Sequence, residues 1–95
     1  MCGGAGASCG DDLPVTHELK CWPPWFQDVQ DGKKTFEVRK NDRGYKVGDI
    51  LMLREWKPET KTYTGRICNV KVTYIMPGVQ LFNDGVAYMS IVRVK

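Results

Sequence analysis

The chain has 95 residues, which is enough for one domain with a single modest core and too few for two. No apolar run approaches the ~18–20 residues that a membrane-spanning helix requires, and the first residues lack a secretory-signal pattern, so we expect a cytoplasmic protein with no membrane partner. The formal net charge of +3 and the pI near 8.7 permit an RNA or nucleotide partner without requiring one, because nucleic-acid-binding domains commonly exceed a pI of ~9.

Residues 1–12 are mainly Gly, Ala, Ser, Cys and Asp and show no periodic apolar pattern. We expect a flexible leader over residues 1–15 and one folded domain over residues 16–95. The four cysteines, Cys2, Cys9, Cys21 and Cys68, include no C-x-x-C pair, so reduced thiols are expected. Cys9, His17 and Cys21 do not have a recognised ligand spacing, and neither a metal nor another cofactor is predicted.

Residues 15–20 predict a short first strand in which His17 and Leu19 share a face. A single histidine is more often a structural hydrogen-bonding group than a catalyst, and we interpret His17 in that way.

Residues 22–32 predict a short helix, because two prolines suit its first turn and Gly32 stands where a C-terminal glycine cap belongs. Trp22, Trp25, Phe26 and Val29 recur at helical spacing. We interpret them as one apolar stripe that packs on the core rather than as a surface for a ligand.

The stretch Gly32-Lys33-Lys34-Thr35-Phe36-Glu37-Val38-Arg39 combines strand-forming residues with the charged side chains of Lys34, Glu37 and Arg39. Glu37 and Arg39 are two residues apart and therefore project from the same face of a strand. On the inside of a small barrel they would have to pair, because buried charge is tolerated only when it is paired. Two interpretations stay open, a structural ion pair and a polar cleft that binds a ligand.

Residues 40–49 predict a polar loop. Residues 49–56 are apolar through four consecutive positions and predict a strand covered on both sides. Residues 57–62 predict a hairpin loop, and residues 63–75 predict a long strand with a bulge at Gly65.

The long strand has one largely apolar face that we expect to point toward the core. This face consists of Arg66, Cys68, Val70, Val72 and Tyr74. Residues 76–85, which end in the tight-turn pair Asp84-Gly85, connect it to a last strand over residues 86–94. The elements are thus about five strands and one definite helix in the order β-α-β-β-β-β, which predicts a mainly β (α+β) domain built as a small, partly closed barrel.

The segment Gly32-x-Lys34-x-x-Glu37-x-Arg39 resembles the G-x-K-x-x-E-x-R signature of the ASCH superfamily, and Val47-Gly48-Asp49-Ile50-Leu51 resembles the Gly-Asp strand opening of its members. Four further segments are similar to a branch of small bacterial and phage-type domains of unknown function. In chain order they are His17-Glu18-Leu19-Lys20, Lys40-Asn41-Asp42-Arg43, Glu55-Trp56 and Tyr63-Thr64-Gly65-Arg66. The resemblance covers Thr16 to Lys95. It implies a PUA-like β-barrel with one or two short helices and an RNA-binding cleft beside the signature segment.

Some ASCH members resemble amidohydrolases that act on acetylated cytidine through a lysine, a threonine three residues later and a distant glutamate. Lys34 matches that lysine, but Glu37 stands at the threonine position. The resemblance therefore favours binding over hydrolysis for this chain.

We expect an RNA- or nucleotide-binding module. Lys34 and Arg39 would neutralise phosphate, and Glu37 would accept a hydrogen bond from an exocyclic amine or a ribose hydroxyl. Further cations would form an electrostatic rim and aromatic rings would stack on bases. These residues are Lys40, Arg43 and Lys46 for the rim and Trp56 and Tyr63, with Tyr45 and Tyr88, for stacking.

Two other classes of function stay open. In an enzyme acting on a modified nucleoside, Lys34 would be a base or nucleophile and Glu37 a general acid or base. Such an enzyme would need a closed pocket and a Lys34 that Glu37 does not hold. A small protein-interaction module would instead need an exposed apolar patch. We expect a monomer in each case.

Overall fold

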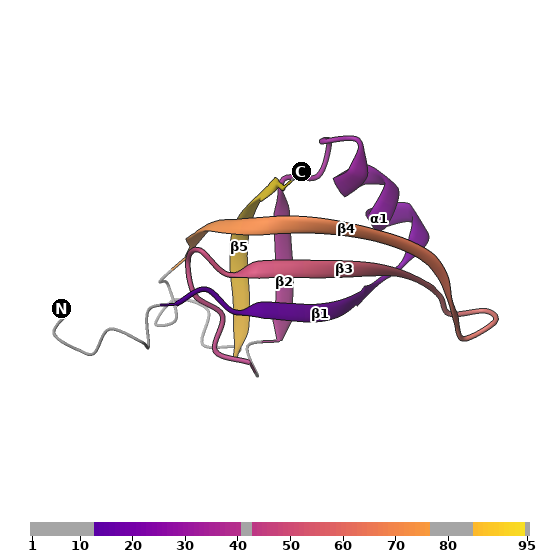
Figure 1. Ribbon diagram of the computed structural model, residues 1–95, viewed down its shortest axis with the longest axis horizontal. Coiled ribbons are helices and arrows are strands. Elements are labelled where there is room, and N and C mark those ends of the chain that lie inside the picture. Colours follow the sequence, from indigo (N-terminus) through magenta and orange to yellow (C-terminus); the bar gives the residue numbers. More distant parts are fainter. Residues whose placement is uncertain (1–12, 41–42, 77–84, 95) are drawn as a thin grey trace, which may run out of the picture.

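The computed structural model describes residues 13–40, 43–76 and 85–94, which form one curled sheet and one helix (Figure 1). The elements in chain order are β1 (Thr16–Cys21), α1 (Pro23–Gln30), β2 (Phe36–Lys40), β3 (Ile50–Lys57), β4 (Thr62–Ile75) and β5 (Val86–Arg93). The predicted mainly β class and the predicted order of elements are confirmed. Parts of three expected segments lie outside the described residues. They are residues 1–12 of the leader, residues 41–42 of the loop, and residues 77–84 of the connection, which include Asp84 of the expected turn.

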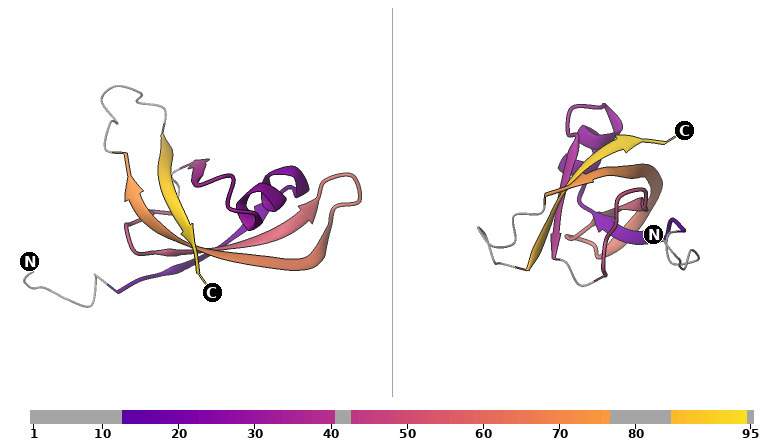
Figure 2. Two further views of the ribbon diagram at one scale, coloured as in Figure 1. Left: turned by 90° about the horizontal axis from the view of Figure 1, so that it is seen from above. Right: turned by 90° about the vertical axis from the view of Figure 1, so that its left-hand side faces the viewer.

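The strands form a single sheet in the order β1-β3-β4-β5-β2, in which β1 and β3 are parallel and the other neighbouring pairs are antiparallel. The 14-residue β4 pairs with β3 along its first part and with β5 along its last part. In Figure 1, β2 and β5 therefore cross the direction of β1, β3 and β4 steeply, and Figure 2 shows α1 on the concave side of the bent sheet. The sheet is a half-barrel with β1 and β2 as its two edges.

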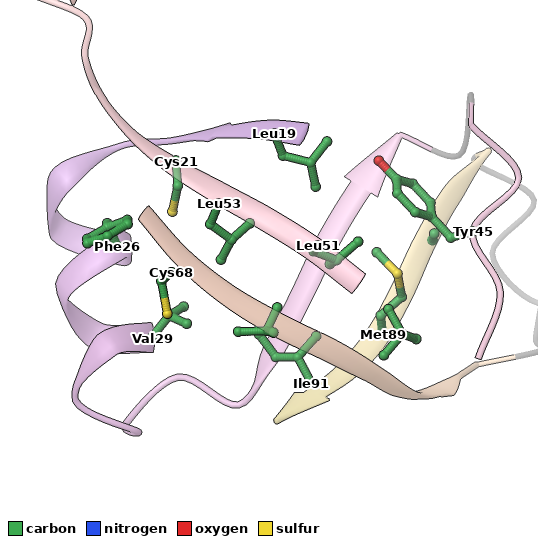
Figure 3. Close-up of a cluster of buried hydrophobic side chains, with 13 residues drawn as sticks. Leu19, Cys21, Phe26, Val29, Tyr45, Leu51, Leu53, Cys68, Met89 and Ile91 are labelled. Atoms are coloured by element: carbon green, nitrogen blue, oxygen red, sulfur yellow. The ribbon is translucent and has the colours of Figure 1, made fainter. Parts of the chain in front are cut away.

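The core fills the space between the concave face and α1 (Figure 3). Leu51 and Leu53 of β3 and Val70 and Val72 of β4 are completely shielded from solvent. Burial alternates along β3, as expected of a strand with one face in the core. The prediction that residues 49–56 are covered on both sides is wrong, because the outward side chains of β3 are only half-buried and α1 packs on the concave side.

The first part of β4 contains the predicted bulge. The register with β3 shifts between Arg54 and Trp56, where β4 holds more residues than β3, and Gly65 lies within this bulge at φ +95°. Arg66 lies on the predicted inward face, although 48% of its side chain stays exposed. Its guanidinium carbon is 4.9 Å from the ring centroid of the buried Phe26, and Nη2 donates a hydrogen bond to the Gln27 side chain at 3.0 Å.

A second register shift corrects the prediction for Tyr74. Between Val72 and Tyr74, β4 has the extra residue Thr73 relative to β5. One extra residue reverses the alternation of side chains between the two faces. Tyr74 is therefore 56% exposed, and the next residue, Ile75, packs against the core instead.

Helix α1 begins with two prolines and buries only Phe26 and Val29. The prediction that Trp22 and Trp25 belong to the buried stripe is wrong, because these side chains are 45% and 51% exposed. Trp22 precedes the helix with extended backbone angles, so helical spacing does not apply to it. The short helix meets the sheet through one narrow side, and Trp25 lies outside that side.

Gly32 ends the helix as predicted, at φ +78°. Its N–H donates to the Val29 carbonyl at 3.0 Å, and the Lys33 N–H donates to the Asp28 carbonyl at 2.9 Å, which is the Schellman pattern. The Lys34 N–H also donates to the Asp28 carbonyl, at 3.0 Å. The cap therefore places Lys34 directly beside the start of β2.

A buried hydrogen-bonded pair anchors β1 to the start of β3. His17 Nε2 donates to Asp49 Oδ2 at 2.8 Å, and the backbone N–H groups of Val15 and Lys46 donate to the same carboxylate at 3.1 and 3.0 Å. Burial alone would raise the pKa of Asp49, but these hydrogen bonds outweigh burial and hold the pKa below its ordinary value of 3.8. This geometry agrees with the structural role predicted for His17.

Asp49→Asn should lower the free energy of unfolding by about 2 kcal/mol at neutral pH, because an amide cannot accept all of these hydrogen bonds. Since the folded-state pKa of Asp49 is depressed, the stabilisation from its carboxylate is fully present above pH 3.8 and is lost as the pH falls through the folded-state pKa. Urea unfolding from neutral pH down to about pH 2.5 should show a difference between wild type and variant that shrinks in acid. A difference that grows in acid would contradict the assignment.

Candidate functional site

Arginine side chains connect the two edges of the half-barrel. Arg39 Nη2, from β2, donates to the carbonyl oxygen of Lys20 in β1 at 2.7 Å. Arg43 Nη1 donates to the carbonyl oxygen of Glu18 at 3.0 Å. Glu18 and Lys20 are two residues apart, so their carbonyl groups point to the same side of β1. The edges are thus joined through long side chains, which leaves more space between them than a backbone ladder would.

Glu37 is the buried charge at this junction and is only 3% exposed. Lys34 Nζ donates to Glu37 Oε1 at 2.8 Å, and Arg39 Nε donates to Glu37 Oε2 at 2.5 Å. Lys34 Nζ also donates to the Phe36 carbonyl oxygen at 2.8 Å. The structure therefore brings together Lys34, Glu37 and Arg39, and the carboxylate is paired on both oxygens, as burial requires.

A hollow of about 310 Å³ opens beside this cluster. Three aromatic and four charged side chains contribute to its wall. They are Trp22, Trp25 and Phe36, and Lys20, Lys34, Glu37 and Arg39. We call it the tryptophan hollow. Three cations against one carboxylate give its wall a positive charge balance, and a volume of this size is at the lower end of the range for small-molecule sites.

Two indole rings stack at the rim of the tryptophan hollow. The ring centroids of Trp22 and Trp25 are 5.6 Å apart with an interplanar angle of 24°. Phe36, on β2, is exposed and carries Lys34 Nζ 4.8 Å from its ring centroid. Aromatic faces of this kind are suited to stacking on a planar ligand beside cations.

Cys21 is the one thiol in the wall of the tryptophan hollow and is buried. Burial, and then the negative charge of Glu37, raise the pKa of Cys21 to about 11. The thiol is therefore protonated at neutral pH, which makes it a weak nucleophile.

Trp56 and Tyr63, predicted as stacking platforms, lie apart from the tryptophan hollow. They are cross-strand partners at the ends of β3 and β4. Lys20 Nζ lies 4.4 Å from the Trp56 ring centroid, and the Arg54 guanidinium carbon lies 3.8 Å from the Tyr63 ring centroid. One face of each ring is therefore covered by a cation.

The predicted cationic rim is spread along the chain after β2. Lys40 ends β2 and is exposed, as are Arg43 and Lys46, and none of the three borders the tryptophan hollow. Tyr45 is buried in the core against His17 and cannot stack on a ligand, whereas Tyr88 in β5 is half-buried.

Sequence reasoning missed Trp22, Trp25 and Phe36 as residues of the site. The signal for the two tryptophans was their apolar spacing, which a buried stripe explains equally well. The position of Trp22 before the two prolines was the one local indication that it lies outside the helix.

Within the three described ranges, no group of three or more His, Cys, Asp and Glu side chains has the arrangement of a metal site. In the same part of the chain, no helix combines the length and apolar character needed to cross a bilayer. Cys9, considered with His17 and Cys21 for a metal, lies outside the described residues.

The sequence matches known proteins in two comparisons. Residues 16–91 match the family described as "Domain of unknown function (DUF3850)". A protein of Escherichia phage P2, described as "Uncharacterized 12.9 kDa protein in GpA 3'region", is 42% identical over 57 residues, which are 60% of this chain. The match spans 50% of the length of that curated relative.

Glu37→Gln should lower the free energy of unfolding by about 2 kcal/mol, because it leaves Lys34 and Arg39 facing each other without a counter-charge. The expected loss is below that of a fully buried pair, since the two cations keep 16% and 25% of their side-chain exposure. Urea unfolding at neutral pH measures the effect.

Glu18→Gln is the matched control for this substitution. Glu18 also pairs with an arginine at 2.5 Å, Arg54, but its side chain is 51% exposed. Its loss should stay below about 0.5 kcal/mol because solvent screens the pair. Equal losses for the two variants would show that the Glu37 cluster contributes no more than a surface ion pair.

Proposed function

The chain belongs to the DUF3850 family, and we propose that this domain binds single-stranded RNA or a nucleotide through the tryptophan hollow. The observation that carries the proposal is the stacked, exposed pair Trp22 and Trp25 in the same wall as Lys34, Glu37 and Arg39. Aromatic faces beside cations are the combination with which proteins hold unstacked bases and their phosphates.

Each charged group has donor or acceptor capacity beyond its contacts within the protein. Arg39 carries five N–H donors, and its described hydrogen bonds go to Glu37 and Lys20. A carboxylate offers about four acceptor positions, and Lys34 and Arg39 occupy one on each oxygen of Glu37. Arg39 is suited to a phosphate oxygen, and Glu37 to an exocyclic amine or a ribose hydroxyl.

The resemblance of the signature segment supports the same assignment. We propose that the chain is a member of the ASCH superfamily with a PUA-like fold. Gly32-x-Lys34-x-x-Glu37-x-Arg39 and the half-barrel of five strands support this proposal. The RNA-binding cleft that the resemblance implies would lie beside that segment, and the tryptophan hollow opens there.

Binding is favoured over hydrolysis by the hydrogen bonds of Lys34. Its Nζ donates to both Glu37 and the Phe36 carbonyl oxygen, so two acceptors of the protein already hold the group that would have to act as base or nucleophile. The protonated thiol of Cys21 gives the hollow no alternative nucleophile.

A protein partner is the second candidate, and exposed apolar side chains favour it. Phe36 and Val38 on the edge strand β2 are exposed, next to the two tryptophans. Apolar residues gathered beside cations suit an acidic, partly apolar protein surface as well as they suit bases.

Titration with a single-stranded RNA of about eight nucleotides should shift the indole N–H signals of Trp22 and Trp25 and leave that of Trp56 in place. The affinity should fall with salt, with a log–log slope of about −2 if three phosphates are neutralised. Trp25→Ala should weaken binding by roughly 10-fold, the loss expected for one stacked base.

Tyr74→Ala is the control, because Tyr74 is an aromatic residue of similar exposure that lies outside the hollow. It should leave the affinity unchanged. If neither the RNA nor mononucleotides at millimolar concentration move any signal of the hollow, RNA binding is wrong and the protein partner becomes the leading candidate.

A further inference from the structure

A second hollow adjoins the first. It has a volume of about 390 Å³, and its wall consists of Trp25, Asp28, Lys33, Lys34 and Phe36. Trp25, Lys34 and Phe36 also border the tryptophan hollow. We call it the Asp28 hollow. The two hollows are therefore adjacent and share two aromatic rings and a cation.

The shared cation has a donor left for a ligand. Within the described residues, Lys34 Nζ donates to the Phe36 carbonyl oxygen and to Glu37 Oε1, each at 2.8 Å. An ammonium group carries three N–H donors. Its side chain retains 16% exposure and borders both hollows.

The remaining walls of the two hollows differ in chemistry. The tryptophan hollow adds a second indole, Trp22, and the guanidinium of Arg39. The Asp28 hollow adds one carboxylate and one cation, those of Asp28 and Lys33. Each hollow thus offers an aromatic face with polar groups of both signs, which is what one base with its sugar requires.

We propose that the smallest unit this domain recognises is two linked nucleotides, with one base in each hollow and the connecting phosphate at Lys34. The inference rests on the proposed function and narrows it from any nucleotide to a dinucleotide step of a single strand. A lone nucleotide occupies the tryptophan hollow, which has the stacked indole pair and Arg39.

The net charge of the ligand distinguishes this proposal from nonspecific attraction of anions to the cations of the hollows. A dinucleoside monophosphate such as UpU or ApA carries one negative charge, whereas a nucleoside monophosphate carries about −1.5 to −2 at neutral pH. If charge alone governed binding, the mononucleotide would bind at least as tightly. If the second base is held, the dinucleotide binds more tightly in spite of its lower charge.

The experiment compares UpU and ApA with the 3′-monophosphates of uridine and adenosine, by calorimetry and amide chemical shifts of the whole chain. The dinucleotides should bind about 10-fold more tightly, a gain within the range of one additional stacked base. They should shift the Lys33 and Asp28 amide signals, which the mononucleotides leave in place.

Two variants separate the hollows. Lys33→Gln should weaken dinucleotide binding about threefold, as expected for loss of one exposed charge, and leave mononucleotide binding unchanged. Trp22→Ala should weaken the binding of both ligands, because each places a base in the tryptophan hollow. Trp22 borders that hollow and not the Asp28 hollow. Lys71→Gln, an exposed lysine on β4 outside both hollows, is the matched control and should change neither affinity.

Each other result overturns a defined part of the scheme. Equal affinity for mononucleotide and dinucleotide rejects the two-nucleotide unit and leaves nucleotide binding standing. The dinucleotides could bind more tightly while Lys33→Gln changes their affinity no more than Lys71→Gln does. That result rejects the Asp28 hollow as the position of the second base. Binding only by longer RNA rejects the dinucleotide as the smallest unit, and no binding by any of these ligands rejects the proposed function itself.

Discussion

The buried carboxylate of Glu37 holds together segments that the sheet alone does not connect. Lys34 reaches it from the turn after α1, and Arg39 reaches it from β2 while bonding the Lys20 carbonyl of β1. The end of the helix and both edges of the half-barrel therefore meet at one charge. Because a buried carboxylate must be paired, the position of each of these segments depends on the others.

Asp49, another buried carboxylate, has a different role. Asp49 is enclosed by His17 and by backbone N–H groups, and it secures β1 against the start of β3 without bordering the two hollows that flank Lys34. Glu37 is equally buried but lies in the wall of a hollow that also contains exposed aromatic rings. Asp49 therefore stabilises the fold away from both hollows, whereas Glu37 stabilises it within the wall of the tryptophan hollow.

Local chemistry explains which predictions agree with the structure. Gly32 ends the helix because a left-handed residue is needed there, and Gly65 lies in a bulge for a similar reason. The pairing of Glu37 with Arg39 follows from their spacing on one strand. The errors concern residues whose exposure depends on distant partners. Tyr74 turns outward because of one extra residue in the β4–β5 register, and Trp22 and Trp25 lie outside the narrow contact of α1 with the sheet.

The sequence by itself determined the mainly β class, the order of the elements, the helix cap and the charged segment, because these depend on residues close together in the chain. It also determined that Lys34, Glu37 and Arg39 lie close enough to form one charged cluster, since they fall within six residues. Only the tertiary structure decided which aromatic residues border that site. Trp22 and Trp25 border it because α1 follows β1 and packs on the concave side against β3 and β4. Trp56 and Tyr63 lie instead at one end of the β3–β4 pair, where Lys20 and Arg54 cover one face of each ring. Which aromatic residues border the cluster depends on how far the sheet bends and where its edges meet. The bend results from many small differences in strand register and side-chain packing, which no local sequence pattern encodes.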